Sequence, residues 1–257
     1  MMRRVVITVL LVVLAWPGIG AAATCGVVFM HGKWGGPSKY ITNVVFQLHQ
    51  AGCVVEAPDL PWSGQRRYDV PARAAMLEID AAVARLKAQG ATAIFIGGHS
   101  MGASAALAYA ARHPGLAGVL AVAPGHDPSL PAFANRIAED VQQARTLVAQ
   151  GRGAEVVRFN DFNNGRSASF PVPAAIYLSY FDPAGLFVIP ENAKHLSAPL
   201  LWVSGSSDPL TRLGRDYAFA RAPADPRSRF IEVPADHLGT PDAAAGQIVD
   251  WVRGLTR

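Results

Sequence analysis

The residues with the clearest chemical potential lie in the segment IFIGGHSMGAS, which runs from Ile94 to Ser104. Its first residues are bulky and apolar, as in a buried strand, and its last residues are small and suit a helix. Ser100 stands between them, flanked by Gly98 and Gly102. A serine hydroxyl is a weak nucleophile by itself, so it needs exposure and a neighbouring base. A sharp turn from strand to helix would expose it and aim the positive end of the helix dipole at developing negative charge.

The two glycines are what such a turn requires. Residues two before and two after the serine must be small, because larger side chains would collide with the neighbouring strand and helix. The helix that would follow, MGASAALAYAAR, is rich in alanine and can approach a sheet closely. The alternative interpretation of Ser100 is an ordinary helix N-cap, a position that serine fills well. The surrounding elements have to decide between the two.

Strand-like and helix-like segments alternate along the chain. Short apolar runs bounded by Gly, Pro, Asp or Ser predict buried strands at 26–30, 54–57, 93–97, 118–122, 200–204 and 230–233. Helical spacing predicts helices at 40–51, 71–89, 101–112, 213–221 and 242–254. Such alternation is typical of a mostly parallel sheet that helices cover on both faces. We therefore predict a single α/β domain over residues 24–257, with about six strands.

One segment, from about residue 126 to 197, breaks this alternation. It holds a polar helix candidate, FANRIAEDVQQARTLVAQG, followed by a stretch rich in aromatic residues, Asn, Gly and Pro. A segment this long between two strands of one sheet is best explained as an insertion that lies over one end of the sheet. We therefore predict a cap insertion.

With these motifs the sequence resembles the α/β-hydrolase superfamily over nearly all of residues 24–257. GHSMG matches the family's nucleophile turn, and the family orders its catalytic triad Ser, then Asp or Glu, then His. The strand LLWVS leads to Asp208, and the last strand, RFIEV, leads to His237. The resemblance implies that Ser100 attacks an acyl carbon, that His237 takes and returns the proton, and that Asp208 orients the imidazole.

Other roles for these residues remain open. Asp236 adjoins His237, but neighbouring residues of an extended segment point in opposite directions. Asp182 is a more distant rival that precedes the strand at 200–204. Asp208 could instead form an Asx-type turn before Pro209, and His237 could be a surface loop residue. Their order along the chain favours the catalytic interpretation.

The resemblance also implies an oxyanion hole made of two backbone N–H groups. One would belong to Met101, directly after the nucleophile, and the other to Lys33, after the HG of VVFMHGKWGGP. Loss of one such donor can raise a reaction barrier by about 3 kcal/mol. Lys33 would act through its main chain, which leaves open whether its ammonium group also meets substrate.

Aromatic residues near the predicted catalytic end are candidates for substrate contacts. Trp34 and Trp62 follow strands at that end, and we take them as the candidate substrate-binding residues. Tyr177, Tyr180 and Phe181 belong to the predicted cap. The alternative for each is an ordinary place in the hydrophobic core.

The first 23 residues have the layout of a secretory signal peptide. Arg3 and Arg4 precede an apolar run that Pro17 ends, and small residues follow where a signal peptidase would cut. A spanning helix would need about 20 apolar residues, which is longer than this run. We therefore predict a periplasmic or secreted protein without a stable membrane span after the signal is removed.

Export would change the chemistry of the two cysteines. Cys25 opens the run CGVVFMHG, and Cys53 opens CVVEAPDL. If both runs are neighbouring parallel strands, the cysteines lie at the same edge of the sheet and can form a disulfide in an oxidising compartment. The alternative is two buried thiols that act as small apolar groups.

Several functional classes have little support. The formal net charge is only +4, and no dense Lys/Arg stripe alternates with aromatic residues, as nucleic-acid binding would favour. The histidines lack the spacing of a metal site. The glycine-rich segments lack the context of a phosphate or dinucleotide loop. We expect no metal, no cofactor and no nucleic-acid partner.

These observations together predict an exported serine hydrolase that cleaves small carboxylic esters through an acyl-enzyme intermediate. The same triad could serve a thioesterase, an amidase or a peptidase, because fold and triad do not choose the leaving group. A catalytically inactive binding protein that kept the scaffold is the remaining alternative. The pattern does not define the acyl chain, the alcohol or the oligomeric state.

Overall fold

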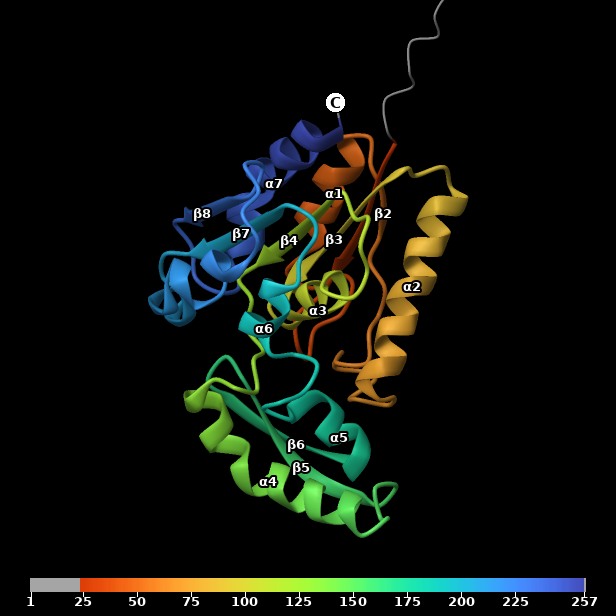
Figure 1. Cartoon of the computed structure of the whole chain (residues 1–257), viewed down its shortest axis with the longest axis vertical. Coiled ribbons are helices and arrows are strands. Elements are labelled where there is room, and N and C mark those ends of the chain that lie inside the picture. Colours follow the sequence, from red (N-terminus) through yellow and green to blue (C-terminus); the bar gives the residue numbers. More distant parts are fainter. Residues whose placement is uncertain (1–23, 257) are drawn as a thin grey trace, which may run out of the picture.

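The computed structural model describes residues 24–256, so the predicted signal peptide lies outside the described residues. Within this range the main sheet has six strands in the order β2-β1-β3-β4-β7-β8, and every pairing is parallel (Figure 1). The strands are β1 (Cys25–Met30), β2 (Val54–Glu56), β3 (Ala93–His99), β4 (Gly118–Val122), β7 (Leu200–Gly205) and β8 (Arg229–Val233). The predicted α/β fold with a parallel sheet of about six strands is confirmed.

Helices cover both faces of the sheet. α1 (Thr42–Gln50) and α7 (Thr240–Thr256) pack on one face, and α2 (Ala72–Ala88), α3 (Met101–Ala110) and α6 (Ile189–Lys194) pack on the other. Successive strand residues point to opposite faces, so Phe95 of β3 joins the first cluster while Ile94 and Ile96 join the second. No helix in residues 24–256 has the length and apolar character needed to cross a membrane.

The segment after β7 differs from its prediction. The helix expected over 213–221 is wrong, because this stretch forms short 3₁₀ turns: η1 (Pro209–Leu213), η2 (Arg215–Tyr217) and η3 (Phe219–Arg221). Gly214 has φ +67° and Ala218 has φ −145°, and neither value fits an α-helix. These two residues divide the apolar pattern into separate turns.

Between β4 and β7 the chain adds a helix, a hairpin and a second helix, which form the lower part of the molecule in Figure 1. They are α4 (Pro131–Ala149), β5 (Val156–Asn163), β6 (Arg166–Pro173) and α5 (Ala174–Phe181), and β5 pairs antiparallel with β6. The hairpin loop consists of Asn164 and Gly165, whose φ values of +48° and +75° fit the type I′ turn of two-residue hairpins.

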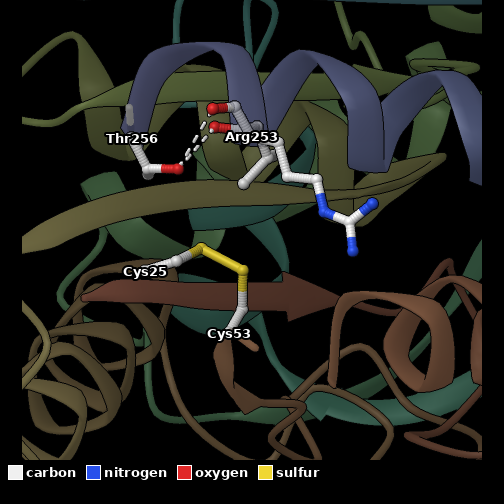
Figure 2. The surroundings of a disulfide bond; sticks show 5 residues. Cys25, Cys53, Arg253 and Thr256 are labelled. Atoms are coloured by element: carbon white, nitrogen blue, oxygen red, sulfur yellow. Dashed lines mark hydrogen bonds between the residues drawn. A yellow bond between two sulfur atoms is a disulfide. The ribbon is translucent and has the colours of Figure 1, made fainter. Parts of the chain in front are cut away.

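A disulfide joins Cys25 at the start of β1 to Cys53 just before β2, as Figure 2 shows. The predicted bond is thus confirmed, and its Cα atoms are 4.5 Å apart. Both cysteines are buried in the cluster that includes the end of α7, where Arg253 and Thr256 lie nearby (Figure 2). The bond therefore closes the edge of the sheet at the amino-terminal ends of its strands.

Candidate active site

Ser100 lies in a strained turn between β3 and α3. Its φ of +56° is uncommon for a residue other than glycine. A Cβ atom on Gly98 would lie 2.6 Å from the carbonyl oxygen of Met30, and one on Gly102 would lie 2.7 Å from that of His31. Both distances are too short for real contacts, so β1 approaches the turn only because the flanking residues are glycines.

His237 and Asp208 complete a hydrogen-bonded chain with Ser100. His237, in the loop between β8 and α7, has its Nε2 3.0 Å from Ser100 Oγ. Its Nδ1 lies 2.6 Å from Oδ2 of Asp208, in the loop after β7. The other carboxylate oxygen of Asp208 accepts the backbone N–H of Leu210 at 2.9 Å. The structure therefore brings together the three residues that the sequence placed in a triad.

The carboxylate of Asp208 sets the direction of these hydrogen bonds. Burial alone would raise its pKa, but hydrogen bonding and charge attraction to His237, together with the Leu210 amide, lower the pKa below its ordinary value. An ionised Asp208 accepts from Nδ1–H, which leaves Nε2 of His237 free to accept the Ser100 hydroxyl proton. The two rival aspartates are engaged elsewhere, since Asp182 pairs with Arg145 at 2.7 Å and Asp236 accepts from the Gly239 amide.

Two further histidines support the loops around the site. His99 donates through Nε2 to the carbonyl oxygen of His237 at 2.9 Å, and burial lowers the pKa of His99 to about 3. His31 accepts the Leu60 amide at Nε2 and donates to Gly32 O, and burial lowers its pKa as well. Both imidazoles are therefore neutral at pH 7, so they brace these loops without adding charge.

The two backbone donors expected to form an oxyanion hole are available. Among residues 24–256, neither the N–H of Lys33 nor that of Met101 has a hydrogen-bond acceptor. Met101 is the first residue of α3, where backbone donors lack partners within the helix. Lys33 and Ser100 line the same two cavities. This availability is what stabilisation of an oxyanion requires.

The side chain of Lys33 turns away from this site, which answers the question that the sequence left open. Its ammonium group donates to Oδ1 of Asp161 at 2.6 Å and to the carbonyl oxygen of Phe162 at 2.9 Å. Burial lowers the pKa of Lys33, and the charge of Asp161 opposes that shift. The ion pair is almost fully buried, so both charges depend on each other.

Asp161, which the sequence did not single out, fastens the insertion to the loop after β1. Besides Lys33, it accepts hydrogen bonds from Trp34 Nε1 at 2.9 Å, from the Tyr68 hydroxyl at 2.6 Å and from the Phe162 amide. Two residues further along β5, Asn163 donates to the carbonyl oxygen of Lys33 at 2.9 Å. The only sequence signal was an aspartate among the aromatic residues of a strand, which needs partners when buried.

The two candidate tryptophans have different places. Trp34 lines the smaller cavity beside Ser100, and its ring meets Phe170 edge to face. The structure does not bring Trp62 to either cavity that contains Ser100. Trp62 is fully buried, and its Nε1 donates to the carbonyl oxygen of His31 at 2.8 Å. It therefore supports the loop that carries Lys33 from behind.

Two cavities within the described chain meet at the Ser100–His237 pair. The smaller is about 130 Å³, and its outer wall consists of Trp34, Lys39, Tyr40, Asn164 and Arg166. The larger is about 320 Å³, and its apolar wall consists of Leu130, Ala132, Phe133, Phe162, Pro209 and Leu210. The hairpin tip lines both cavities. Within residues 24–256, no three His, Cys, Asp or Glu side chains are grouped to hold a metal ion.

Comparison with protein families settles the relationship that the fold and the site suggest. A model described as the Alpha/beta hydrolase family matches residues 27–251. The chain belongs to this family. A comparison with curated proteins found no match.

Solved structures agree with this assignment of the α/β hydrolase. A structure reported with the metagenome-derived lipolytic enzymes LipS and LipT is 16% identical, with TM-score 0.65, and the match covers 91% of this chain and 95% of that one. The monoacylglycerol lipase of Paleococcus ferrophilus is 22% identical, with TM-score 0.66 and coverage of 91% and 97%. Est1E from Butyrivibrio proteoclasticus, with ferulic acid bound, is 16% identical, with TM-score 0.58 and coverage of 93% and 91%. Identities this low show a shared fold.

Proposed function

We propose that this α/β hydrolase is a serine hydrolase that cleaves small carboxylic esters. The observation that carries the proposal is the chain of hydrogen bonds from Asp208 to His237 at 2.6 Å and from His237 to Ser100 at 3.0 Å. It lies where two cavities meet, so an acyl group and an alcohol group can extend from the reacting carbon into separate spaces.

In the proposed reaction, Ser100 Oγ attacks the acyl carbon while His237 Nε2 takes the hydroxyl proton. The backbone N–H groups of Lys33 and Met101 stabilise the oxyanion, and Asp208 stabilises the imidazolium cation. His237 then protonates the leaving alcohol, which leaves an acyl group on Ser100. Water attacks this acyl-enzyme with His237 as the base, and the acid and free serine are released.

The substrate class rests on the site and on analogy. The names of the similar structures describe lipolytic enzymes and a lipase, which makes an ester the first substrate to test. The complete hydrogen-bonded triad and the free donor groups argue against an inactive binding protein. A thioester, an amide or a peptide would use the same residues, so these substrates belong in the same assay.

We also propose that the protein is exported and that the segment at about 126–197 acts as a cap. The Cys25–Cys53 bond supports export, because disulfides persist mainly in oxidising compartments. The predicted signal peptide at residues 1–23 points the same way. The hairpin tip lines both cavities, which supports a role of this segment in shaping the substrate site.

The test uses residues 24–257 with a fluorophosphonate probe and a panel of 4-nitrophenyl esters and thioesters of graded length. We expect the probe to label the protein and Ser100→Ala to abolish both labelling and turnover, by about 10⁴-fold or more. The variant should keep its melting temperature, because the side chain is small. Ser206→Ala, which changes an exposed serine after β7, is the control and should retain labelling. Equal labelling or turnover in Ser100→Ala would refute the proposal.

A further inference from the structure

The smaller cavity beside Ser100 carries positive charge without a compensating carboxylate. Lys39 and Arg166 both line it, and no aspartate or glutamate does. Within residues 24–256, neither cation belongs to an ion pair. The third cation of the lining, Lys33, is committed to Asp161 and has no charge to offer. Lys39 and Arg166 are therefore the cations that remain for a ligand in this cavity.

The hairpin geometry keeps Arg166 at this place. Arg166 pairs with Asn163 at the end of the β5–β6 ladder, directly after the two-residue loop. The Asn163 side chain ties this end of the hairpin to Lys33 O at 2.9 Å, within the segment next to the reacting centre. A tight turn with a side-chain anchor leaves the backbone little freedom, so the guanidinium moves only through its own rotamers.

Lys39 approaches from the opposite wall. It belongs to the loop between β1 and α1, and its ammonium group lies 5.4 Å from the centre of the Tyr40 ring. Tyr40 is itself part of the cavity lining and contacts His99 edge to face. The two cations thus come from separate elements, the loop after β1 and the hairpin tip, and line one cavity.

The larger cavity has a different character. Its charged lining combines Arg136 with Asp127 and Asp208, and the rest is largely apolar. The carboxylate of Asp127 accepts from Ser129, from the Ile189 amide and from the Tyr217 hydroxyl, and Arg136 lies over the Phe162 ring at 5.4 Å. An apolar group suits the larger cavity, and a group with negative charge suits the smaller one.

We propose that Lys39 and Arg166 form an anion subsite, so that the preferred substrate is an ester with an oxyanionic group on one side of the scissile bond. The inference rests on the proposed ester hydrolysis at Ser100 and adds the substrate class. A cavity lined by one sign of charge concentrates ions of the opposite sign. A guanidinium binds a carboxylate or a phosphate through paired hydrogen bonds, which adds geometric preference to the attraction.

The test compares esters that differ only in charge. Mono-4-nitrophenyl adipate is paired with its neutral methyl ester, which places the charge in the acyl group. 4-Acetoxybenzoate is paired with methyl 4-acetoxybenzoate, which places it in the leaving group, and 4-acetoxyphenyl phosphate distinguishes a phosphate from a carboxylate. We expect kcat/KM to favour the anion in at least one pair by about tenfold, the size of one charge-assisted contact. Added salt should reduce this preference.

Variants then assign the preference to the two cations. Arg166→Gln and Lys39→Gln should each remove most of it, and the double variant should abolish it, while kcat/KM for the neutral esters stays within about twofold. The control is Arg158→Gln, which changes an exposed arginine of the same hairpin outside both cavities. It should leave both members of each pair unchanged.

The outcomes separate this inference from the proposed function. Neutral esters hydrolysed with Ser100 dependence, but with no preference for any anionic ester, would overturn the subsite and leave the serine hydrolase intact. An anionic preference that survives in the double variant would also overturn it. If no ester is hydrolysed and no probe reacts at Ser100, the proposed function fails first, and the subsite inference falls with it.

Discussion

The sheet and the insertion contribute to the same site in different ways. Ser100, Asp208 and His237 follow β3, β7 and β8, so the carboxyl ends of parallel strands bring them to one edge. The insertion adds long-range side-chain contacts instead, chiefly those of Asp161 and Asn163 to Lys33. The backbone of the sheet therefore positions the reacting groups, while the insertion holds a loop beside them and walls the cavities.

This difference has an energetic consequence at the boundary between the two regions. The Lys33–Asp161 pair joins residues 128 positions apart and is almost fully buried. A buried charge is costly when its partner is removed, whereas an exposed pair contributes little. The following predictions test whether the insertion is anchored through this pair and whether the sheet is stabilised independently of it.

The largest effect is expected at Asp161. Asp161→Asn leaves the Lys33 ammonium buried without a counter-charge and should lower the free energy of unfolding by about 3–5 kcal/mol. It should also lower kcat more than it changes KM, because the Lys33 N–H is less firmly held. Urea titration and steady-state kinetics measure both effects.

Two further variants make the Asp161 prediction decisive. Asp182→Asn breaks the more exposed pair with Arg145 and should cost no more than about 1 kcal/mol. Lys33→Met combined with Asp161→Asn removes both charges and should recover part of the lost stability. A loss at Asp161→Asn as small as that at Asp182→Asn would mean that the pair does not anchor the insertion.

The second prediction concerns the sheet alone. Replacing Cys25 and Cys53 by Ala removes a cross-link between residues 28 positions apart, which should cost about 3–4 kcal/mol of unfolding free energy. At low temperature kcat/KM should stay within about twofold, because the bond lies at the amino ends of the strands and Ser100 at the carboxyl end. Dithiothreitol should lower the melting temperature of the wild type and not of the variant. A large loss of activity in the folded variant would contradict the separation of the two ends.

The third prediction uses His99, which lies in the sheet. Its pKa is about 3 in the folded protein, against an ordinary value of 6.5, because the ring is buried. A base with a lowered pKa takes up its proton first in the unfolded state, so its stability contribution is complete above pH 6.5. That contribution is lost as the pH falls towards 3, by up to about 1.4 kcal/mol per pH unit. Unfolding titrations between pH 7 and 4 should show a shallower loss in His99→Gln, and equal slopes would refute the assignment.

The smallest effect is expected at the hairpin tip. Gly165 has φ +75°, and a Cβ atom there would meet nothing within 4 Å, so Gly165→Ala costs only backbone strain, about 1 kcal/mol. The melting temperature should fall by a few degrees. Gly246→Ala, in α7, is a useful contrast, since a helical position with open space should gain slightly in stability. A fall of more than about 3 kcal/mol at Gly165 would show that the tip packs more tightly than described.

Much of the fold followed from local pattern. Strands buried on both faces appear as short apolar runs, and each of the six expected runs overlaps a strand of the main sheet. The expected helix over 213–221 was wrong, because its apolar residues matched a helical period while Gly214 interrupted it. The hairpin was not predicted, although Asn164–Gly165 is a strong signal for a two-residue turn.

The candidate site divides in the same manner. The order of Ser100, Asp208 and His237 could be read along the chain, because parallel strands convert that order into neighbouring positions at one edge. Trp62 matched the same logic, yet packing turned it into the support behind His31. Asp161 could not be found, because nothing near it in the chain shows that a lysine 128 residues earlier will be its partner.

The sequence alone determined where the chain turns sharply around a serine, which strands lie in the core and which cysteines share an edge. These features depend on residue size and on periodicity over a few positions. Only the tertiary structure decided that Lys33 is paired with Asp161, and that Lys39 and Arg166 line a cavity without a carboxylate. Charge pairing depends on distances between segments that are remote in the chain, and those distances exist only once the whole fold has formed.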